Sequence, residues 1–492
     1  MGARRRPPGE MSPPALSRTL VRDRASPVVG LAAGARPPPR PPGGPMTATF
    51  DATDFESEMY DPDEVEMIPA TGERKPGHYP VDISTKAFWN QTSEQREESF
   101  AVLRREQPVS WQRPVDDAVP PDPDDPGYWA VVKHADIVRV SRDNDTFISG
   151  QGVLFDLLPP IFLELTQSFL AMDNPKHDQL RKLVASAFTP KQIKSIEDKI
   201  TLAAKEIVDG FASEPSGEID FVTRCAKLLP TRIFCDIMGI PEHLREATEK
   251  NAADIVAWAD DEVLAGRQAD EVQIQAATNL HDIATELIEL KRAEPSDDLV
   301  TSLIDAEVDG RTLDDFEIGS FFVLMAVAGT DTTRHTASLT VRAMTHFPEQ
   351  RQWLMEDYEG RIGNSIEEFI RYACPVMTFR RTAVKETELG GHTVIPGDKV
   401  VLFYPSGCMD EDVFDSPGTF DLSRANARDH TGFGGGGVHF CLGNQLAKSM
   451  LRALFRELLT RIPEFEAGEP ELLGTNFMRG VKRMPFRFTP EK

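Results

Sequence analysis

The sequence predicts a mainly α-helical protein with short extended segments, and three stretches of the chain support this fold class. Residues 321–328 are apolar on every face of a helix, which is typical of a helix that runs through the centre of a protein. Residues 446–459 carry Leu, Met and Phe at helical spacing. Residues 128–138 read as a short strand that runs into a helix. Charged helical segments between residues 240 and 312 fit the same class.

The composition excludes several classes of protein. The 492 residues carry a formal net charge of −25 at pH 7, which argues against nucleic acid and anionic membranes as partners. The five cysteines are odd in number and form no C-x-x-C pair, so we expect neither a disulfide framework nor a zinc site. Such cysteines fit a reducing, cytoplasmic location. No apolar run of ~20 residues occurs, and we therefore expect no membrane anchor.

The first 45 residues differ from the rest. They contain eight Arg and eleven Pro but only two acidic residues. A segment of this composition cannot bury a core, so we expect a disordered leader over residues 1–45. It is Arg-rich and acid-poor like a transit peptide, but a start at Met46 is the simpler interpretation. Residues 46–492 are then one catalytic domain.

The loop from Phe433 to Gly443 has the most unusual composition in the chain. Four consecutive glycines, 434–437, allow its backbone to lie against a large flat group and to adopt positive φ angles. Cys441 follows at the start of the helical pattern, where a helix N-terminus favours the thiolate. The N–H groups of Leu442 and Gly443 can point at the sulfur and set the potential of a bound iron.

Two other interpretations of this loop remain open from the loop alone. The glycines match G-x-G-x-x-G, but a polar segment precedes them in place of the apolar strand that a dinucleotide site requires. Cys441 could also be a nucleophile with His439 as its base, and such an enzyme would be colourless.

Residues 328–333, Ala-Gly-Thr-Asp-Thr-Thr, place polar groups inside the apolar helix. The hydroxyl of Thr332 can bond the carbonyl four residues earlier, and we expect a functional break in the helix there. The turn from Glu307 to Gly310 precedes it, and Thr312 with Asp315 forms a candidate capping box.

Further charged residues have spacings that suggest shared faces. His177 and Arg181 lie four apart on one helical face and suit an anionic group such as a propionate. Alternation in the extended segment after Thr378 puts Arg380 and Arg381 on opposite faces. The apolar stretch 150–172 lacks a clean period and reads as a loop that could line a cavity.

Taken together, these motifs resemble the cytochrome P450 family, whose axial haem ligand is a cysteine thiolate. The resemblance runs from about Tyr128 to Phe488. In the usual pattern the Phe lies seven residues before the Cys, whereas Phe433 lies eight before Cys441. This longer loop resembles bacterial members that hydroxylate sterol side chains and methyl-branched lipids, as do the turn after Glu307 and the segment Met478-Arg-Gly-Val-Lys.

The resemblance implies a fold, a cofactor and roles for individual residues. The fold is mainly α with small β-sheets, and the cofactor is heme b with Cys441 as the axial ligand of its iron. Asp331 and Thr332 deliver protons, whereas Glu368, Arg371 and Arg424 form a buried ion cluster that serves folding. The residues that bind the haem propionates are His177, Arg181, Arg381 and His439.

The implied reaction is monooxygenation of a hydrophobic small molecule, most specifically ω-hydroxylation of a sterol side chain or methyl-branched lipid. A terpenoid or macrocycle is the alternative substrate, and a non-catalytic haem-binding protein is the alternative class. The sequence has no flavin or iron–sulfur motif, so a ferredoxin and its reductase are the expected electron donors. Lys448, Arg452 and Arg456 recur every fourth residue beside Cys441 and are the predicted ferredoxin site.

Overall fold

In the computed structural model, the residues that can be described belong to one compact unit within Ser57–Lys492. The structure describes residues 68–69, 75–116, 123–155, 160–166, 168–185, 188, 190–308 and 310–491. The predicted leader and the proposed start at Met46 lie outside these residues.

This unit is mainly helical, as predicted. The segment predicted to run through the centre of the protein lies in α12 (Asp315–His346). The helix predicted to follow Cys441 is α16 (Asn444–Arg461). The other α-helices are α1 (Lys86–Trp89), α2 (Ser93–Glu106), α3 (His134–Arg142), α4 (Pro160–Leu165), α5 (Lys176–Ala185), α6 (Pro190–Asp209), α7 (Leu228–Met238), α8 (Glu242–Val256), α9 (Asp261–Leu264), α10 (Ala269–Ala293), α11 (Leu299–Ile304), α13 (Pro348–Glu356), α14 (Tyr358–Ala373) and α15 (Tyr404–Cys408).

Over the part of the chain that the structure describes, the strands form five small sheets. They are β1 (Val109–Gln112), β2 (Tyr128–Val131), β3 (Phe147–Ile148), β4 (Glu218–Asp220), β5 (Glu307–Val308), β6 (Arg311–Thr312), β7 (Thr378–Ala383), β8 (Thr387–Leu389), β9 (His392–Val394), β10 (Lys399–Phe403), β11 (Phe465–Ala467), β12 (Glu471–Leu472), β13 (Val481–Arg483) and β14 (Pro485–Phe488). The largest sheet has the order β1-β2-β10-β7-β3, in which only the β2–β10 pair is parallel. Its β2 strand and the α3 helix confirm the predicted strand-to-helix segment.

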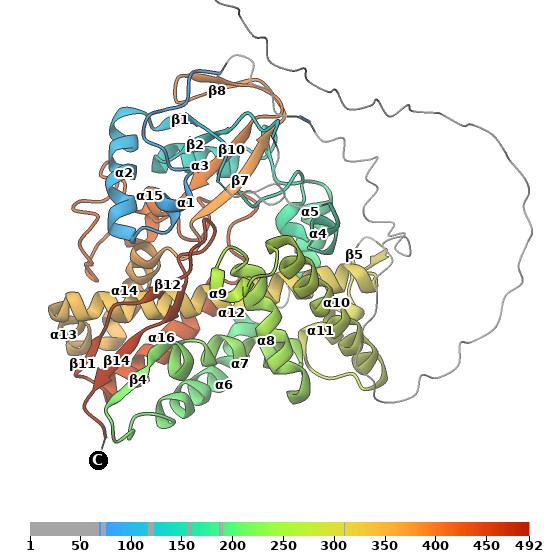
Figure 1. The fold of residues 1–492 in the computed structure, drawn as a ribbon. Helices are drawn as coiled ribbons and strands as arrows, with labels where there is room; N and C mark the ends of the chain where they lie inside the picture. Colours follow the sequence, from blue (N-terminus) through green and yellow to red (C-terminus); the bar gives the residue numbers. More distant parts are fainter. Residues whose placement is uncertain are drawn as a thin grey trace, which may run out of the picture. The chain divides into compact units, whose positions relative to one another are not determined.

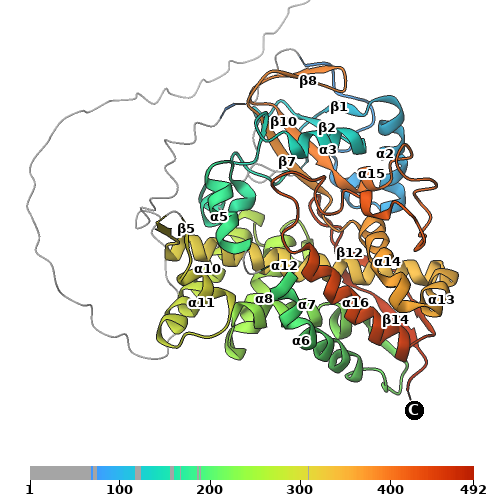
Figure 2. The same cartoon turned by 180° about the vertical axis from the view of Figure 1, so that it is seen from behind.

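Helix α12 forms the centre of the helical part because its apolar residues leave no face for water. It packs against α7, α8, α10 and α14, and most of its residues from Glu317 to Met344 are buried. Figures 1 and 2 show it crossing the helical part, with the five-stranded sheet on one side of it and α6, α7 and α8 on the other. The predicted central helix is therefore confirmed.

The start of α12 differs from the prediction. Asp314, not Thr312, is the N-cap, and it forms a capping box with Glu317 through bonds of 2.7 and 2.9 Å. Thr312 is instead paired with Glu307 in the β5–β6 hairpin. The predicted box at Thr312 and Asp315 is wrong because the hairpin holds the chain extended to Thr312.

The predicted loop over residues 150–172 also contains structure, because Pro160 begins the short helix α4 and residues 169–171 form a 3₁₀ turn. A fixed φ favours proline at the first position of a helix. The sequence did not reveal this helix, since no hydrophobic period accompanies it.

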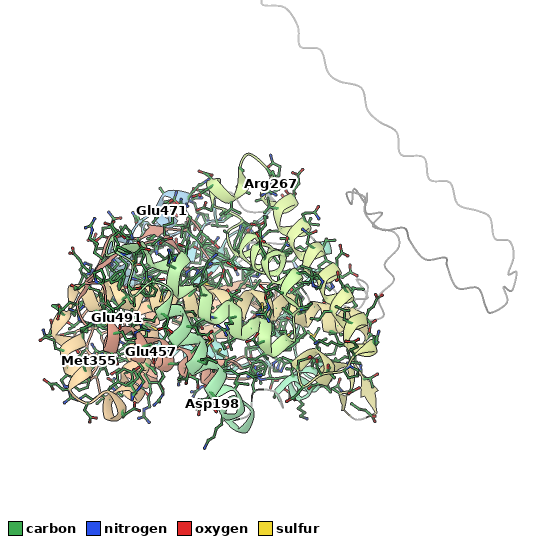
Figure 3. The ribbon with its side chains drawn as sticks, turned by 90° about the horizontal axis from the view of Figure 1, so that it is seen from below. Asp198, Arg267, Met355, Glu457, Glu471 and Glu491 are labelled. Atoms are coloured by element: carbon green, nitrogen blue, oxygen red, sulfur yellow. The ribbon has the colours of Figure 1, made fainter. Side chains whose placement is uncertain are left out.

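Acidic side chains lie at the surface. Figure 3 labels Asp198 and Glu471, which are exposed, and Glu457 and Glu491, which are partly exposed. Within the described residues, no helix combines the length and apolar character that crossing a bilayer requires.

Candidate active site

A cavity lies between α5, α12, α16, strand β7 and the glycine-rich loop. Its empty volume, including its open mouth, is about 1370 Å³. Several polar residues line the cavity, among them Arg181, Thr332, Arg381, Tyr404, His439 and Cys441.

The four glycines of the loop all have positive φ, as predicted, but they do not all face a flat group. A Cβ on Gly437 would lie 2.1 Å from the Ser141 carbonyl oxygen, and one on Gly435 would lie 2.5 Å from the Ser141 hydroxyl. These glycines therefore let the loop pack closely on α3. Gly434 lines the cavity and has no atom within 3.8 Å of its Cβ position.

Cys441 is fixed by backbone and side-chain hydrogen bonds. Its N–H donates to the Phe433 carbonyl at 3.1 Å, and Asn444 Nδ2 donates to its carbonyl at 2.7 Å. Burial raises the pKa of the thiol, and the Gly443 N–H and the charges of Arg181 and Lys448 act against this rise. A bound metal ion deprotonates such a thiol outright.

The wall beside Cys441 is cationic. Arg181 and Arg381 line it, and none of the described residues that line the cavity is an Asp or a Glu. Burial lowers the pKa of both arginines, because a buried cation lacks its solvent. Arg380 points the other way and donates to the Gln151 and Gly152 carbonyls, which confirms the predicted alternation. The cavity can therefore accommodate an anionic group.

His439 and His177 meet behind this wall. Their ring centroids are 4.6 Å apart, and His439 Nε2 lies 3.0 Å from the Ser149 hydroxyl. His439 Nδ1 and His177 Nε2 are buried without a partner. Burial, followed by the charge of Arg381, lowers the pKa of His439 to about 2. Unpartnered buried nitrogens usually mark a missing group.

Thr332 and Asp331 face different surroundings. Thr332 lines the cavity, and its hydroxyl donates to the Ala328 carbonyl at 2.9 Å. Asp331 is not among the lining residues; it is 2% exposed and pairs with Arg334 at 3.0 Å, while its Oδ2 has no partner. Burial raises its pKa. Helix α12 runs unbroken past both residues, so the predicted break is wrong: the hydroxyl bond adds to the helix without interrupting it.

The predicted ion cluster is present and fully buried. Glu368 accepts two bonds of 2.7 Å from Arg371 and one of 3.2 Å from Arg424. Arg371 also donates to the Cys408 carbonyl at 2.8 Å. The cluster joins α14 to α15 and to the loop near Arg424, and it lies outside the cavity lining.

A sequence model of the family described as "Cytochrome P450" matches residues 128–466. The chain belongs to the cytochrome P450 family.

Curated relatives are close along most of this P450. A Mycobacterium tuberculosis methyl-branched lipid omega-hydroxylase is 38% identical over 82% of this chain and 94% of its own length. A Mycolicibacterium smegmatis steroid C26-monooxygenase is 34% identical over 80% of this chain and 90% of its own. A solved structure of a Mycobacterium marinum cytochrome P450, CYP268A2, in complex with pseudoionone has 50% identity and a TM-score of 0.81, and the match covers 84% of this chain and 99% of that chain.

This P450 is therefore a monooxygenase whose cofactor is haem with a cysteine thiolate ligand. The residues of the cavity fit that group. A thiol, two arginines and His439, whose buried Nδ1 has no partner among the described residues, line the cavity, and Ala328 and Gly329 leave space there. The predicted His177 is not among the described lining residues; it contacts the ring of His439 instead. His439 Nε2 lies within bonding distance of the Ser149 hydroxyl, and among the described residues no hydrogen bond joins His439 to Cys441.

Sequence reasoning missed two polar residues of the site. Ser149 holds His439, and Tyr404 lines the cavity at the end of β10. Neither residue stands in a motif with a period or a spacing that points to a cavity.

Proposed function

We propose that this P450 hydroxylates the terminal methyl group of a branched aliphatic chain, on a sterol side chain or a methyl-branched lipid. The observation that carries the proposal is the similarity to the omega-hydroxylase over 82% of the chain, together with an apolar wall above the cysteine loop. The residues of this wall are Phe169, Leu170, Leu324, Met325, Ala328, Val376 and Phe379.

The proposed roles of the chain's own residues follow from their positions. Cys441 supplies the thiolate. Arg181, Arg381 and His439 hold the propionates, and His177 supports His439 through the ring contact of 4.6 Å. When bound, haem supplies the activation of oxygen that the chain itself cannot perform. Two carboxylates bound there would offset the cost of burying these cations.

Thr332 and Asp331 are proposed to hold and move protons. The Thr332 hydroxyl already donates to the Ala328 carbonyl, so its oxygen can accept a further bond from a water in the cavity. Asp331 does not face the cavity, and burial favours its protonated form. We therefore propose that Asp331 holds a proton and passes it on through Thr332 or through a water beside Thr332.

Binding must set the site of attack, because a terminal methyl C–H is stronger than its neighbours in the same chain. A long apolar chain buries enough surface, at roughly 25 cal/mol per Å², to anchor its end from a distance. The apolar wall leaves few polar groups that could hold a ring system in another orientation.

The test is a panel of sterols, methyl-branched fatty acids, terpenoids and macrocycles. The haem spin-state shift reports binding, and product analysis reports the carbon attacked. We expect terminal hydroxylation of a branched lipid or sterol side chain. Products hydroxylated only within the chain or on a ring would refute the proposal.

A terpenoid substrate is the second candidate, because the M. marinum structure at 50% identity holds pseudoionone. The same panel separates the two, since only a terpenoid enzyme would show its largest spin-state shift with acyclic terpenoids. Terminal attack on both classes would favour the first proposal.

The assignment of Cys441 has its own experiment. We expect Cys441→Ser to lose the red-shifted Soret band of the reduced carbonyl complex that thiolate ligation gives. Cys235→Ser is the matched control, because Cys235 is buried and is not among the described residues that line the cavity. A thiolate spectrum in the Cys441 variant would refute the ligand.

A ferredoxin is the proposed electron donor, in a reducing cytoplasm that the five unpaired cysteines support. The predicted docking face is only partly available. Lys448 and Arg456 pair with Glu367 and Glu359 of α14, whereas Arg452 is exposed and has no ion pair among the described residues. Phe440, which is 39% exposed, lies beside Cys441.

We expect Arg452→Glu to slow reduction by an acidic ferredoxin and to weaken the salt dependence of the rate. Lys250→Glu on α8 reverses an exposed charge elsewhere and should change neither. Equal rates for Arg452→Glu and the unchanged protein would place the docking site elsewhere.

A further inference from the structure

A second pocket lies between α1, α2, the end of β10 and α15, and we call it the α2 pocket. Its empty volume, including its open mouth, is about 690 Å³. Among the described residues, none lines both this pocket and the cavity beside Cys441. Met377 and Phe403 line the α2 pocket, whereas their chain neighbours Val376 and Tyr404 line the cavity. The two spaces are therefore distinct.

The inner surface of the α2 pocket is mainly apolar. The rings of Trp89 and Phe403 stack with their centroids 6.1 Å apart, and the ring of Phe100 lies 5.5 Å from that of Phe403. These three residues and Met377 are all buried. The side chain of Glu94, which also lines the pocket, is 59% exposed, so the pocket opens to solvent there.

Two buried arginines line the same pocket, and neither forms an ion pair with a carboxylate among the described residues. They are Arg96, which is 5% exposed, and Arg479, which is 9% exposed. Arg96 Nη1 donates to two carbonyls near the end of α1 at 2.8 and 2.7 Å. Arg479 Nη1 donates to two carbonyls at the end of α14 at 2.8 and 3.0 Å. One nitrogen thus fixes each guanidinium, and its other two make no hydrogen bond among the described residues.

The pocket contains two donors that are buried without a partner among the described residues. They are Arg479 Nε and Trp89 Nε1. A buried donor without an acceptor loses its bonds to water and gains nothing in return. Such groups are rare in folded proteins, and they usually mark a place where another molecule binds.

A comparison with Arg104, on the same helix α2, shows what Arg96 lacks. Arg104 is 2% exposed; burial opposes its charge, but bonds to Glu411 and Glu97 outweigh burial and raise its pKa. At Arg96, burial, followed by the charge of Arg479, lowers the pKa to about 10. Arg96 is therefore a buried cation without an anion bonded to it.

The glutamates that line the α2 pocket bond other arginines. Glu94 pairs with Arg342 at 3.0 Å, and Glu97 pairs with Arg104. The charge of Glu94 acts on Arg96 from a distance, but no hydrogen bond joins the two. A ligand that fits this pocket must therefore bring its own negative charge together with an apolar body.

We propose that the α2 pocket binds a fatty acid, with its carboxylate at Arg96 and Arg479 and its alkyl chain against Phe100 and Phe403. Two guanidinium groups and the indole N–H of Trp89 can donate to both oxygens of one carboxylate. The rings then shield the chain from water. Inorganic phosphate carries the charge but has no apolar part for these walls to bury. This second site is independent of which substrate the enzyme takes.

Calorimetry on the full-length, haem-loaded protein tests the proposal, after the cavity has been filled with clotrimazole, an imidazole that binds the haem iron. We expect decanoate to bind at one site per chain with clotrimazole in place. Acetate, which has only the head group, and decanol, which has only the chain, should bind at least about tenfold more weakly. Absence of decanoate binding, or equal binding of decanol, would overturn the proposal. Phosphate that binds as tightly as decanoate would also overturn it.

A photoreactive fatty acid locates the site. Decanoic acid with a diazirine on its chain is irradiated with the protein, again in the presence of clotrimazole, and tryptic peptides are mapped. Trypsin releases residues 87–96 and 97–104 as separate peptides, which carry Trp89 and Phe100. We expect cross-links in these two peptides. Cross-links confined to peptides that line the cavity would place the fatty acid there and contradict a second site.

Variants connect binding to individual donors. Trp89→Phe keeps an aromatic ring but removes the Nε1–H, so it should fold and bind decanoate roughly tenfold more weakly. Arg96→Gln removes a charge and should weaken binding roughly 10–100-fold. Trp258→Phe is the matched control, because Trp258 is 3% exposed and is not among the described residues that line either space.

The control should bind decanoate like the unchanged protein. Thermal unfolding shows whether Arg96→Gln folds, and Trp89→Phe decides the result if it does not. Unchanged affinity in Trp89→Phe, or in a folded Arg96→Gln, would refute the site.

Discussion

Thr332 lines the cavity together with Thr333 and Thr336 of the same helix, and loss of its hydroxyl should impair the chemistry while leaving binding intact. We expect Thr332→Ala to keep haem and substrate binding but to divert reducing equivalents to peroxide, because no other lining hydroxyl donates to the Ala328 carbonyl. General acid–base steps contribute typically ~10²–10⁴-fold, so the fall in product per electron should be large.

The control for this variant is Thr345→Ala on the same helix. Its hydroxyl makes the equivalent bond to the Val341 carbonyl at 3.1 Å, but it does not line the cavity. In Thr345→Ala, the share of reducing equivalents that ends in hydroxylated product should stay unchanged. Peroxide yield that rises equally in both variants would indicate a general effect of helix damage.

Residue-scale prediction succeeded where an unusual residue type stood in an unusual place. Cys441 and His439 were predicted from one segment and Arg381 from another, and the structure places all three around one cavity. Asp331 was predicted beside Thr332, yet it faces Arg334, since adjacent residues on a helix are about 100° apart. Spacing identifies a polar residue inside an apolar helix but does not determine which neighbour it faces.

At the scale of elements, the start of α12 gives a sharp test of local structure. Asp314→Ala should lower the free energy of unfolding by about 1 kcal/mol, because its side chain accepts from the Glu317 N–H at 2.7 Å. Thr312→Ala should change it by less than about 0.5 kcal/mol, since Thr312 is exposed and lies in β6. Chemical denaturation of both variants measures the difference. A larger loss in Thr312→Ala would restore the box predicted from the sequence.

The long helices were predictable because their apolar periods extend over many residues, as in α12 and α16. Strand partners were not, because β5 pairs with β6 through two residues on each side and carries no hydrophobic alternation. Helix α4 could not be predicted for the same reason, because its sequence carries no hydrophobic period. Short elements are fixed by their tertiary surroundings, and a sequence contains only a weak signal for them.

For the whole molecule, buried histidines make stability depend on pH. His335 on α12 is fully buried, and its Nδ1 accepts from the Val481 N–H at 3.1 Å. Burial, with the charge of Arg334, holds its pKa well below the ordinary value of 6.5. The unfolded chain therefore binds the proton first, so stability is present above about pH 6.5 and is lost as the pH falls below it.

The free energy of unfolding should fall less steeply with decreasing pH in His335→Gln than in the unchanged protein. The slope should differ by up to about 1.4 kcal/mol per pH unit, which is the contribution of one proton. Urea unfolding at pH 7.5 and pH 5.5 measures the slope separately from any constant loss of stability. His243→Gln, at an exposed site, should leave the slope unchanged. An unaltered slope in His335→Gln would place the acid sensitivity in other buried histidines.

The parallel pair in the largest sheet has a consequence for how the chain is made. Trp129 of β2 aligns with Val400 of β10, about 270 residues later. At roughly 5–20 residues per second, a ribosome needs about 15–55 s to synthesise that interval. During this time the β1–β2 hairpin exists without its central neighbour, and one edge of β2 remains open to any other strand. The sheet can therefore close only after β10 has been synthesised, and the net charge of −25 would oppose pairing of the open edge with another copy of the chain in the meantime.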